Sequence, residues 1–244
     1  MSVAIVTGAS RGLGEALAAG LARTGWSLVV DGRDPDTLGA AAERIRAGAT
    51  GGARVVAVVG DIADDAHRHD LTAAAFELGG LDLVVNNAGT LGTSPLPSLA
   101  DYPLDDLRVA FEINVVAPLA LLQDALPLLL DSPHPRVLDV TSDAAVEAYE
   151  GWGGYGAGKA ALEHLGAVLA VEFPALTVWS VDPGDLRTAM HQAAFPGEDI
   201  SDRPEPATVV PALVELIGSS RPSGRYRAAD LVATGTAGTA GAGA

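Results

Sequence analysis

The sequence predicts an α/β protein built on a doubly wound parallel sheet with helices on both faces. Two observations support this fold class. Short apolar runs alternate with longer segments that carry apolar residues at helical spacing along the 244 residues. The short runs are also nearly continuous in Val, Ile, Leu and Ala, which is typical of strands buried on both faces of a parallel sheet. Ligands of such sheets bind at the carboxyl ends of the strands.

The expected elements follow one another in regular alternation. Six strands are expected, at residues 2–7, 27–31, 54–59, 81–86, 136–141 and 176–181. Five helical segments lie between them, at residues 14–24, 34–47, 65–79, 103–130 and 155–173. No internal boundary or repeat divides residues 1–232, so they are predicted to form one Rossmann-type domain. The Pro- and Gly-containing residues 185–206 predict a mobile flap, and the Ala/Gly/Thr-rich residues 233–244 predict a flexible tail.

The composition argues against several classes of function. The chain has 15 basic and 31 acidic residues, a net charge of −16, which argues against binding to nucleic acid or to anionic membranes. It has no Cys, so disulfides and thiolate chemistry are excluded. No secretory signal is recognisable and no apolar run reaches the ~20 residues of a membrane span, so a cytoplasmic protein is expected. His67 and His69 stand among aspartates on an expected surface helix, and no metal site is predicted from them.

A glycine-rich turn follows the first strand. Residues 7–14 read TGASRGLG and place Gly8, Gly12 and Gly14 between a strand and a helix. Glycines let the backbone turn tightly and approach a phosphate, and the helix that follows presents free N–H groups to an anion. Alone, the turn is a weak signal that a tight strand-to-helix connection also explains, but its position favours a coenzyme site.

The end of the second strand is where a dinucleotide presents its adenosine ribose. The chain reads Asp31, Gly32, Arg33 at this point. With Gly32 at the ribose-facing position, no carboxylate holds the 2′-hydroxyl, and Arg33 and Arg11 are available for a 2′-phosphate. This register favours NADP(H). A shift of one residue would bring Asp31 to the ribose and favour NAD(H).

Further short motifs appear in a fixed order. After TGASRGLG come Asp61 in VVGDIAD, NNAG at 86–89, Asn114 in FEINVVAP, Ser142 in VLDVTSD, Tyr155 and Lys159 as Y-x-x-x-K, and PGDLRT at 183–188. On these motifs the chain resembles the short-chain dehydrogenase/reductase family over about residues 3–188. It departs from the family pattern at Gly158, where many members carry Ser, and in its closing segment, SGRYRAADLVAT.

The resemblance implies a set of site residues. The implied catalytic residues are Asn114, Ser142, Tyr155 and Lys159. The implied coenzyme-binding residues are Gly8, Ser10, Arg11, Gly12, Leu13, Gly14, Arg33, Asp61, Ile62, Asn87, Ala88, Gly89, Tyr155, Lys159, Pro183, Gly184, Leu186 and Thr188. The loops after strands four, five and six, with Val146, Tyr149, Trp152, Met190 and Phe195, are expected to form the substrate pocket.

The spacing of Tyr155 and Lys159 carries a chemical expectation. Residues four apart on a helix share a face, so the amine lies one turn from the phenol. A cation at this distance lowers the pKa of a phenol and suits Tyr155 to general acid and base catalysis. Ser142 is expected to hydrogen-bond the substrate oxygen, and Asn114 to hold a water that links Lys159 to solvent.

The expected function is transfer of a hydride between NADP(H) and a carbonyl or alcohol substrate. Two alternatives remain at this point: a coenzyme sensor or scaffold that turns nothing over, and an epimerase or dehydratase that recycles its coenzyme. The segments 103–130 and 155–173 are rich in Ala and Leu, and in the family they build a dimer interface, so a homodimer or homotetramer is expected.

Overall fold

The computed structural model describes residues 1–235 and contains a sheet of seven strands, all parallel, in the order β3-β2-β1-β4-β5-β6-β7. The strands are β1 (Val3–Val6), β2 (Ser27–Gly32), β3 (Val55–Val59), β4 (Leu83–Asn86), β5 (Arg136–Val140), β6 (Thr177–Asp182) and β7 (Gly224–Arg227). The chain order reverses between β1 and β4, so the predicted doubly wound fold is confirmed. The sequence prediction missed β7, because its four residues GRYR contain no apolar run.

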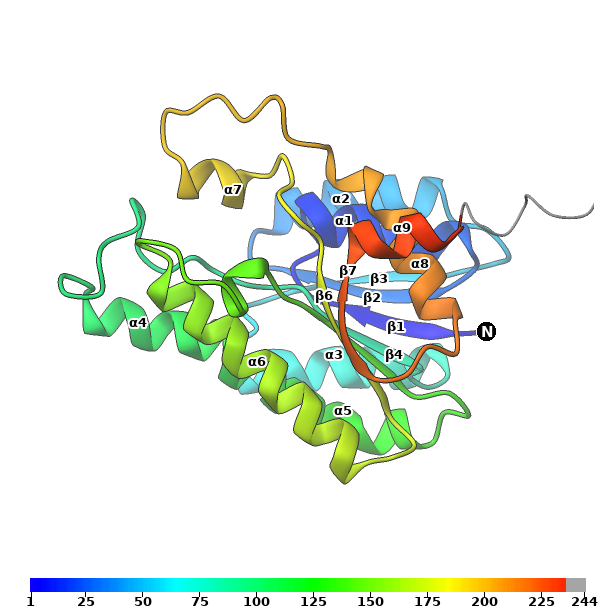
Figure 1. The fold of residues 1–244 in the computed structure, drawn as a ribbon. Coiled ribbons are helices and arrows are strands. Elements are labelled where there is room, and N and C mark those ends of the chain that lie inside the picture. The colour runs from blue at the N-terminus through cyan, green and yellow to red at the C-terminus, as the bar shows by residue number, and fades with distance from the viewer. Residues whose placement is uncertain (236–244) are drawn as a thin grey trace, which may run out of the picture.

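Helices cover both faces of the sheet (Figure 1). One layer consists of α1 (Gly12–Arg23), α2 (Pro35–Ala47), α8 (Val210–Gly218) and α9 (Ala228–Gly235). The other consists of α3 (Asp65–Leu78), α4 (Leu104–Phe111), α5 (Ala117–Leu130) and α6 (Gly153–Glu172). The short helix α7 (Ala189–Ala194) stands apart from both layers, beyond the carboxyl ends of the strands.

Alternate residues of the central strands enter two separate cores. In β1, Ala4 and Val6 belong to the core under α1 and α8, whereas Val3 and Ile5 belong to the core under α3 and α5. Both faces of a central strand are therefore buried from solvent, which is why its sequence is apolar at every position. Trp179 of β6 is fully buried in the first core and donates from its indole N–H to the carbonyl oxygens of Arg221 and Pro222.

The segment expected as one helix over 103–130 is a continuous helix, Leu104–Leu130, with a π-helical turn at Glu112–Val116 inside it. By length and composition alone this helix could cross a membrane. Its apolar residues have another explanation, because Leu121, Leu122 and Leu129 pack into the core beneath the sheet. The π-turn places Asn114 fully inside the protein.

Local signals explain where several helices begin and end. The Asp34 carboxylate caps α2 by accepting from the Thr37 N–H at 2.8 Å, and Pro35 occupies the first turn. Gly79 ends α3 in the left-handed conformation, with φ of 112°. Helix α9 continues to Gly235, three residues into the predicted tail, and the rest of that tail, 236–244, lies outside the described residues.

Candidate active site

One cavity of about 1600 Å³ opens at the carboxyl ends of the strands. That volume exceeds the range of a typical small-molecule pocket, about 300–1000 Å³, and leaves room for a dinucleotide together with a second ligand. The cavity is lined by every residue implied by the family resemblance except Gly14 and Asn114. The fold therefore brings together motifs that lie as far apart in the sequence as Gly8 and Thr188.

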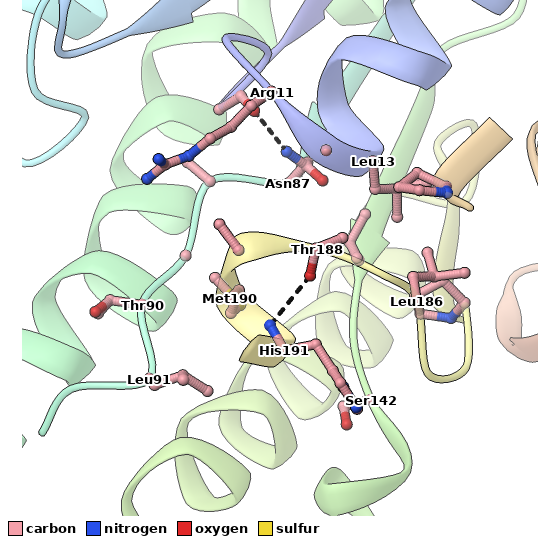
Figure 2. Close-up of a pocket in the computed structure, with 18 of the residues that line it drawn as sticks. Arg11, Leu13, Asn87, Thr90, Leu91, Ser142, Leu186, Thr188, Met190 and His191 are labelled. Atoms are coloured by element: carbon pink, nitrogen blue, oxygen red, sulfur yellow. Dashed lines mark hydrogen bonds between the residues drawn. The ribbon is translucent and has the colours of Figure 1, made fainter. Parts of the chain in front are cut away.

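The glycine-rich turn between β1 and α1 is held by hydrogen bonds from β4. Gly8 and Gly12 have φ of 66° and 62°, in the left-handed region that disfavours residues with a side chain. The Asn87 side-chain amide donates to the Gly8 carbonyl oxygen at 3.1 Å (Figure 2) and to the Thr7 carbonyl oxygen at 2.8 Å. The Thr7 hydroxyl oxygen accepts from the N–H groups of Asn87 and Ala88 at 3.0 Å each. These bonds fix the turn beside the N-terminus of α1, where an anion is stabilised.

Gly14 supports the turn from beneath instead of lining the cavity. A Cβ atom at Gly14 would lie 2.4 Å from the Gly8 carbonyl oxygen and 2.4 Å from the Asn87 amide nitrogen. Only a glycine therefore lets α1 pack this closely against the phosphate-binding turn. Arg11 precedes the helix and makes no side-chain capping bond to it.

Asp31 and Gly32 at the end of β2 both line the cavity. The Asp31 side chain is 3 % exposed, and its Oδ1 accepts from the N–H of Gly8. A Cβ atom at Gly32 would lie 3.0 Å from the Ser10 Cβ, so a longer side chain does not fit there without movement. Arg11 and Arg33 both line the cavity, are exposed and form no ion pair within residues 1–235. These features fit a 2′-phosphate better than a ribose 2′-hydroxyl.

A second partner of Asp31 was not foreseen. His67 is buried, although its helix was expected on the surface, and its Nε2 lies 3.0 Å from Asp31 Oδ2. Gly60 makes room for the imidazole, because a Cβ atom at Gly60 would lie 2.2 Å from His67 Nδ1. His69, two residues further along, is exposed, with Nε2 3.5 Å from an oxygen of Asp124. The two histidines thus occupy unrelated environments.

Tyr155 and Lys159 lie one turn apart near the start of α6, and both are buried. Lys159 Nζ donates to the Val140 carbonyl oxygen at 2.8 Å and lies 5.7 Å from the centre of the Tyr155 ring. Burial lowers the pKa of Lys159 to about 8, against the opposing effect of Asp139 and Glu163. For Tyr155, burial and then the charges of Asp143 and Asp182 raise the pKa well above its usual range, so the expected lowering by Lys159 is not observed in the protein alone.

Ser142 follows β5 and is hydrogen-bonded to an acidic neighbour. Its hydroxyl donates to Asp143 Oδ1 at 2.9 Å and accepts from the N–H of Ala144 at 3.2 Å. The other oxygen of Asp143 accepts from the Tyr149 hydroxyl at 3.0 Å. Burial alone would raise the pKa of Asp143, but hydrogen bonds from Ser142, Tyr149 and Ala144 hold it below the usual value. The Ser142 hydroxyl therefore has the Asp143 carboxylate as an adjacent hydrogen-bond acceptor.

Strand β7 contributes a cation that the sequence analysis did not identify. The Arg225 guanidinium donates to Glu163 Oε1 at 3.0 Å and to the Ser142 carbonyl oxygen at 3.1 Å. Glu163 also accepts from the Thr141 hydroxyl at 2.6 Å. The backbone around Ser142 is thereby tied to α6 and β7. No motif identified this role for Arg225, since it depends on the pairing of β7 with β6.

The two asparagines of the family motifs have structural partners. Asn114 donates to the Thr90 carbonyl oxygen at 2.8 Å and accepts from the Thr90 N–H at 2.9 Å, so it lies behind the cavity wall. Asn86 donates to Oδ1 of the buried Asp139 at 2.7 Å. Burial raises the pKa of Asp139 to about 6, in spite of Asn86 and Lys159. Neither Asn86 Oδ1 nor Asp139 Oδ2 has a hydrogen-bond partner in the described part of the chain.

The end of the cavity nearest Ser142 has apolar and aromatic walls. Trp152 contacts the Tyr155 ring edge to face, with 5.7 Å between centroids, and contacts Phe195 at 6.0 Å. Leu91, Tyr149 and Met190 also line this end, as expected for the last two. Val146 does not line the cavity, and its side chain is exposed. The expected flap over 185–206 forms part of this wall through α7.

The adenine and nicotinamide ends of the expected coenzyme site also have defined positions. Asp61 and Ile62 follow β3 and line the cavity beside Gly60. Pro183, Gly184 and Leu186 follow β6, and the Thr188 hydroxyl caps α7 by accepting from the His191 N–H at 3.1 Å (Figure 2). The cavity thus runs from the end of β3 across the sheet to α7.

Comparison with known proteins gives consistent matches. A family model described as short chain dehydrogenase matches residues 2–199. Sepiapterin reductase of Rattus norvegicus is 35% identical over 203 residues, which is 79% of this chain and 77% of that protein. A short chain dehydrogenase of Shigella flexneri, solved in complex with NADP, has a TM-score of 0.86 and 31% identity over 93% of this chain and 97% of its own. One of Escherichia coli, complexed with NADPH, has a TM-score of 0.85 and 30% identity over 93% and 96%.

Proposed function

The chain belongs to the short chain dehydrogenase family, and we propose that within it the protein is an NADP(H)-dependent reductase or dehydrogenase of a carbonyl–alcohol pair. One observation carries the proposal. A single cavity holds the glycine-rich turn at one end and Ser142, Tyr155 and Lys159 at the other. A coenzyme bound at the turn would extend toward Ser142, Tyr155 and Lys159, the side chains that can donate or accept a proton.

The residues present fit this coenzyme. Gly8 and Gly12 carry no side chain and both line the cavity, which leaves the backbone N–H groups at the start of α1 accessible to a diphosphate. Arg11 and Arg33 are available for the 2′-phosphate that distinguishes NADP(H) from NAD(H). When bound, the reduced coenzyme supplies the hydride for carbonyl reduction.

The side chains around Ser142 supply the remaining chemistry. In reduction the Tyr155 hydroxyl donates its proton to the substrate oxygen, and a phenol kept neutral by burial is suited to this step. Ser142 orients that oxygen by a hydrogen bond. Lys159, whose Nζ lies on the same face of α6, stabilises the phenolate that remains and returns a proton to it. Trp152 and Phe195 exclude water from this end of the cavity.

We also infer that two copies associate through the helices α4, α5 and α6. These helices lie side by side on one face of the molecule (Figure 1). They expose Val109, Val116, Leu130, Val168 and Val171, which is more apolar surface than a single packed helix layer needs. A dimer in the cytoplasm is the expectation, and sedimentation at micromolar protein checks it. A monomeric mass would contradict the dimer.

The experiment that tests the function has two steps. Fluorescence titration with NADPH and NADH measures coenzyme affinity, and loss of absorbance by the reduced nicotinamide over a panel of ketones and aldehydes measures turnover. Tight NADPH binding with consumption supports the proposal, and Tyr155→Phe is expected to abolish consumption while retaining binding. Binding without consumption over the whole panel would favour a sensor or scaffold, and binding of neither coenzyme would overturn the proposal.

A further inference from the structure

His191 carries a buried nitrogen that nothing in the protein satisfies. It is the third residue of α7, and its side chain is 9 % exposed although the helix lies at the edge of the molecule. The residue lines the cavity, and its side chain extends from α7 toward the end where Ser142 lies (Figure 2). Its Nε2 is inaccessible to solvent and has no hydrogen-bond partner among residues 1–235.

The ring is held in a fixed position by three neighbours. The backbone N–H of His191 donates to the Thr188 hydroxyl at 3.1 Å, which sets the first turn of α7. One face of the imidazole packs on Phe195, with 5.0 Å between ring centroids. The carboxylate of Asp185 lies 3.8 Å from Nδ1. Phe195 in turn contacts Trp152, and Trp152 contacts Tyr155, so aromatic contacts connect His191 to the proposed proton donor.

A buried polar atom without a partner costs free energy, so a ligand group that pairs with it gains a favourable interaction. The neutral tautomer with its proton on Nδ1 turns that proton toward the Asp185 carboxylate, 3.8 Å away. In that tautomer Nε2 is a hydrogen-bond acceptor. A ligand that satisfies Nε2 therefore offers an O–H or N–H group.

The charges around this end of the cavity favour a substrate group that donates a hydrogen bond over a substrate group that is an anion. Asp143 and Asp185 both line the cavity. Arg187 is occupied by an ion pair with Glu205, and Arg203 by ion pairs with Asp202 at 3.0 Å and with Asp185 at 3.7 Å. Lys159 is turned toward the Val140 carbonyl oxygen. A carboxylate or phosphate on the substrate would face the Asp143 and Asp185 carboxylates here, and Arg187 and Arg203 are already paired with acidic side chains.

From these observations we propose that His191 is a substrate-binding residue that accepts a hydrogen bond from a hydroxyl or amine group on the substrate. The substrate class is then a hydroxyketone or aminoketone, or the corresponding diol or amino alcohol, in preference to a plain alkyl ketone or a keto acid. This inference rests on the proposed function and narrows it. The Ser142 and Tyr155 hydroxyls bind the reacting oxygen, and His191 binds the second polar group.

The test compares ketones that differ only in that second group. 2-Hydroxyacetophenone is paired with propiophenone, and 3-hydroxypropiophenone with butyrophenone, because each pair exchanges a hydroxyl for a methyl at one of two distances from the carbonyl. The wild type is expected to favour the hydroxyketone of at least one pair by about tenfold in kcat/KM, the effect of one buried hydrogen bond. Benzoylformate, the matched keto acid, is expected to be the poorest substrate.

Three substitutions assign the preference to one atom. His191→Leu removes both nitrogens, and His191→Asn keeps a polar atom near Nδ1 but not near Nε2. Both are expected to bring the preference ratio close to one. His191→Gln places a polar atom near Nε2 and is expected to restore part of the preference. The matched control is His69→Leu, a 67 % exposed histidine on α3, and NADPH affinity is measured for every variant to verify folding.

The outcomes separate the inference from the function it rests on. Turnover without preference in either pair, or a preference that survives His191→Leu, overturns the role of His191 and leaves the reductase proposal standing. No NADPH consumption with any ketone overturns the reductase proposal and this inference with it.

Discussion

Asp31 and His67, 36 positions apart in the sequence, form a buried carboxylate–imidazole pair with 3.0 Å between Oδ2 and Nε2. The same carboxylate accepts from the N–H of Gly8 through its other oxygen. His67 on α3 is therefore connected through Asp31 to the glycine-rich turn on which the coenzyme is expected to lie.

Replacing His67 by Leu is expected to weaken both the fold and NADPH binding. The substitution leaves the Asp31 carboxylate buried with a single donor, which costs about 2–4 kcal/mol in the free energy of unfolding. Urea denaturation and NADPH titration measure the two effects. The double variant Asp31→Ser/His67→Val removes both partners and is expected to be more stable than His67→Leu. Equal stability of the single and double variants would contradict the assigned pairing.

Arg33 is expected to determine the preference for NADP(H). A guanidinium bonded to a phosphate contributes about 1.5–3 kcal/mol, so Arg33→Ala is expected to raise the Kd of NADPH about 10- to 100-fold. The Kd of NADH, which lacks the 2′-phosphate, is expected to change less than about threefold. Arg23→Ala on the far end of α1 is the control. Parallel loss of affinity for both coenzymes would show that Arg33 acts on the fold instead of on the phosphate.

Much of this fold could be predicted because its signals are local. The central strands are apolar on both faces, and the glycine turn and the Tyr155–Lys159 spacing are short motifs read without knowledge of the rest of the chain. The missed features depend on contacts between distant segments. Strand β7 is short and polar, and only its pairing with β6 makes it a strand. The Asp31–His67 contact and the orphaned nitrogen of His191 have no sequence signal, since an isolated His is equally consistent with a surface position.

Asp139→Asn is expected to stabilise the protein at neutral and alkaline pH. Burial raises the pKa of Asp139 from 3.8 to about 6. The stability that the protonated carboxyl group contributes is therefore complete below pH 3.8 and is lost as the pH rises through about 6. The neutral Asn removes that loss. The expected gain in the free energy of unfolding is about 1–2 kcal/mol at pH 8 and falls toward zero near pH 4.

Thermal unfolding of both proteins from pH 4 to pH 9 measures this difference. The substitution also removes the anion that raises the pKa of Lys159, so that pKa is expected to fall below about 8. The alkaline limb of the pH–rate profile should shift to lower pH accordingly. A stability difference independent of pH would show that Asp139 does not titrate in this range.

Two glycines one turn or less from the catalytic pair are expected to respond oppositely to alanine. A Cβ atom at Gly158 would lie 3.5 Å from the Asn114 Cβ, an ordinary contact, and the helix continues through this residue. Gly158→Ala is therefore expected to raise the free energy of unfolding by about 0.5–1 kcal/mol, because glycine is unfavourable inside a helix. A Cβ atom at Gly156 would lie 2.4 Å from the Ala144 carbonyl oxygen. Gly156→Ala is therefore expected to lower the free energy of unfolding by about 1–3 kcal/mol. Urea midpoints at one fixed protein concentration compare the two variants, and a change of the same sign in both would disprove the assigned packing of α6 against Ala144.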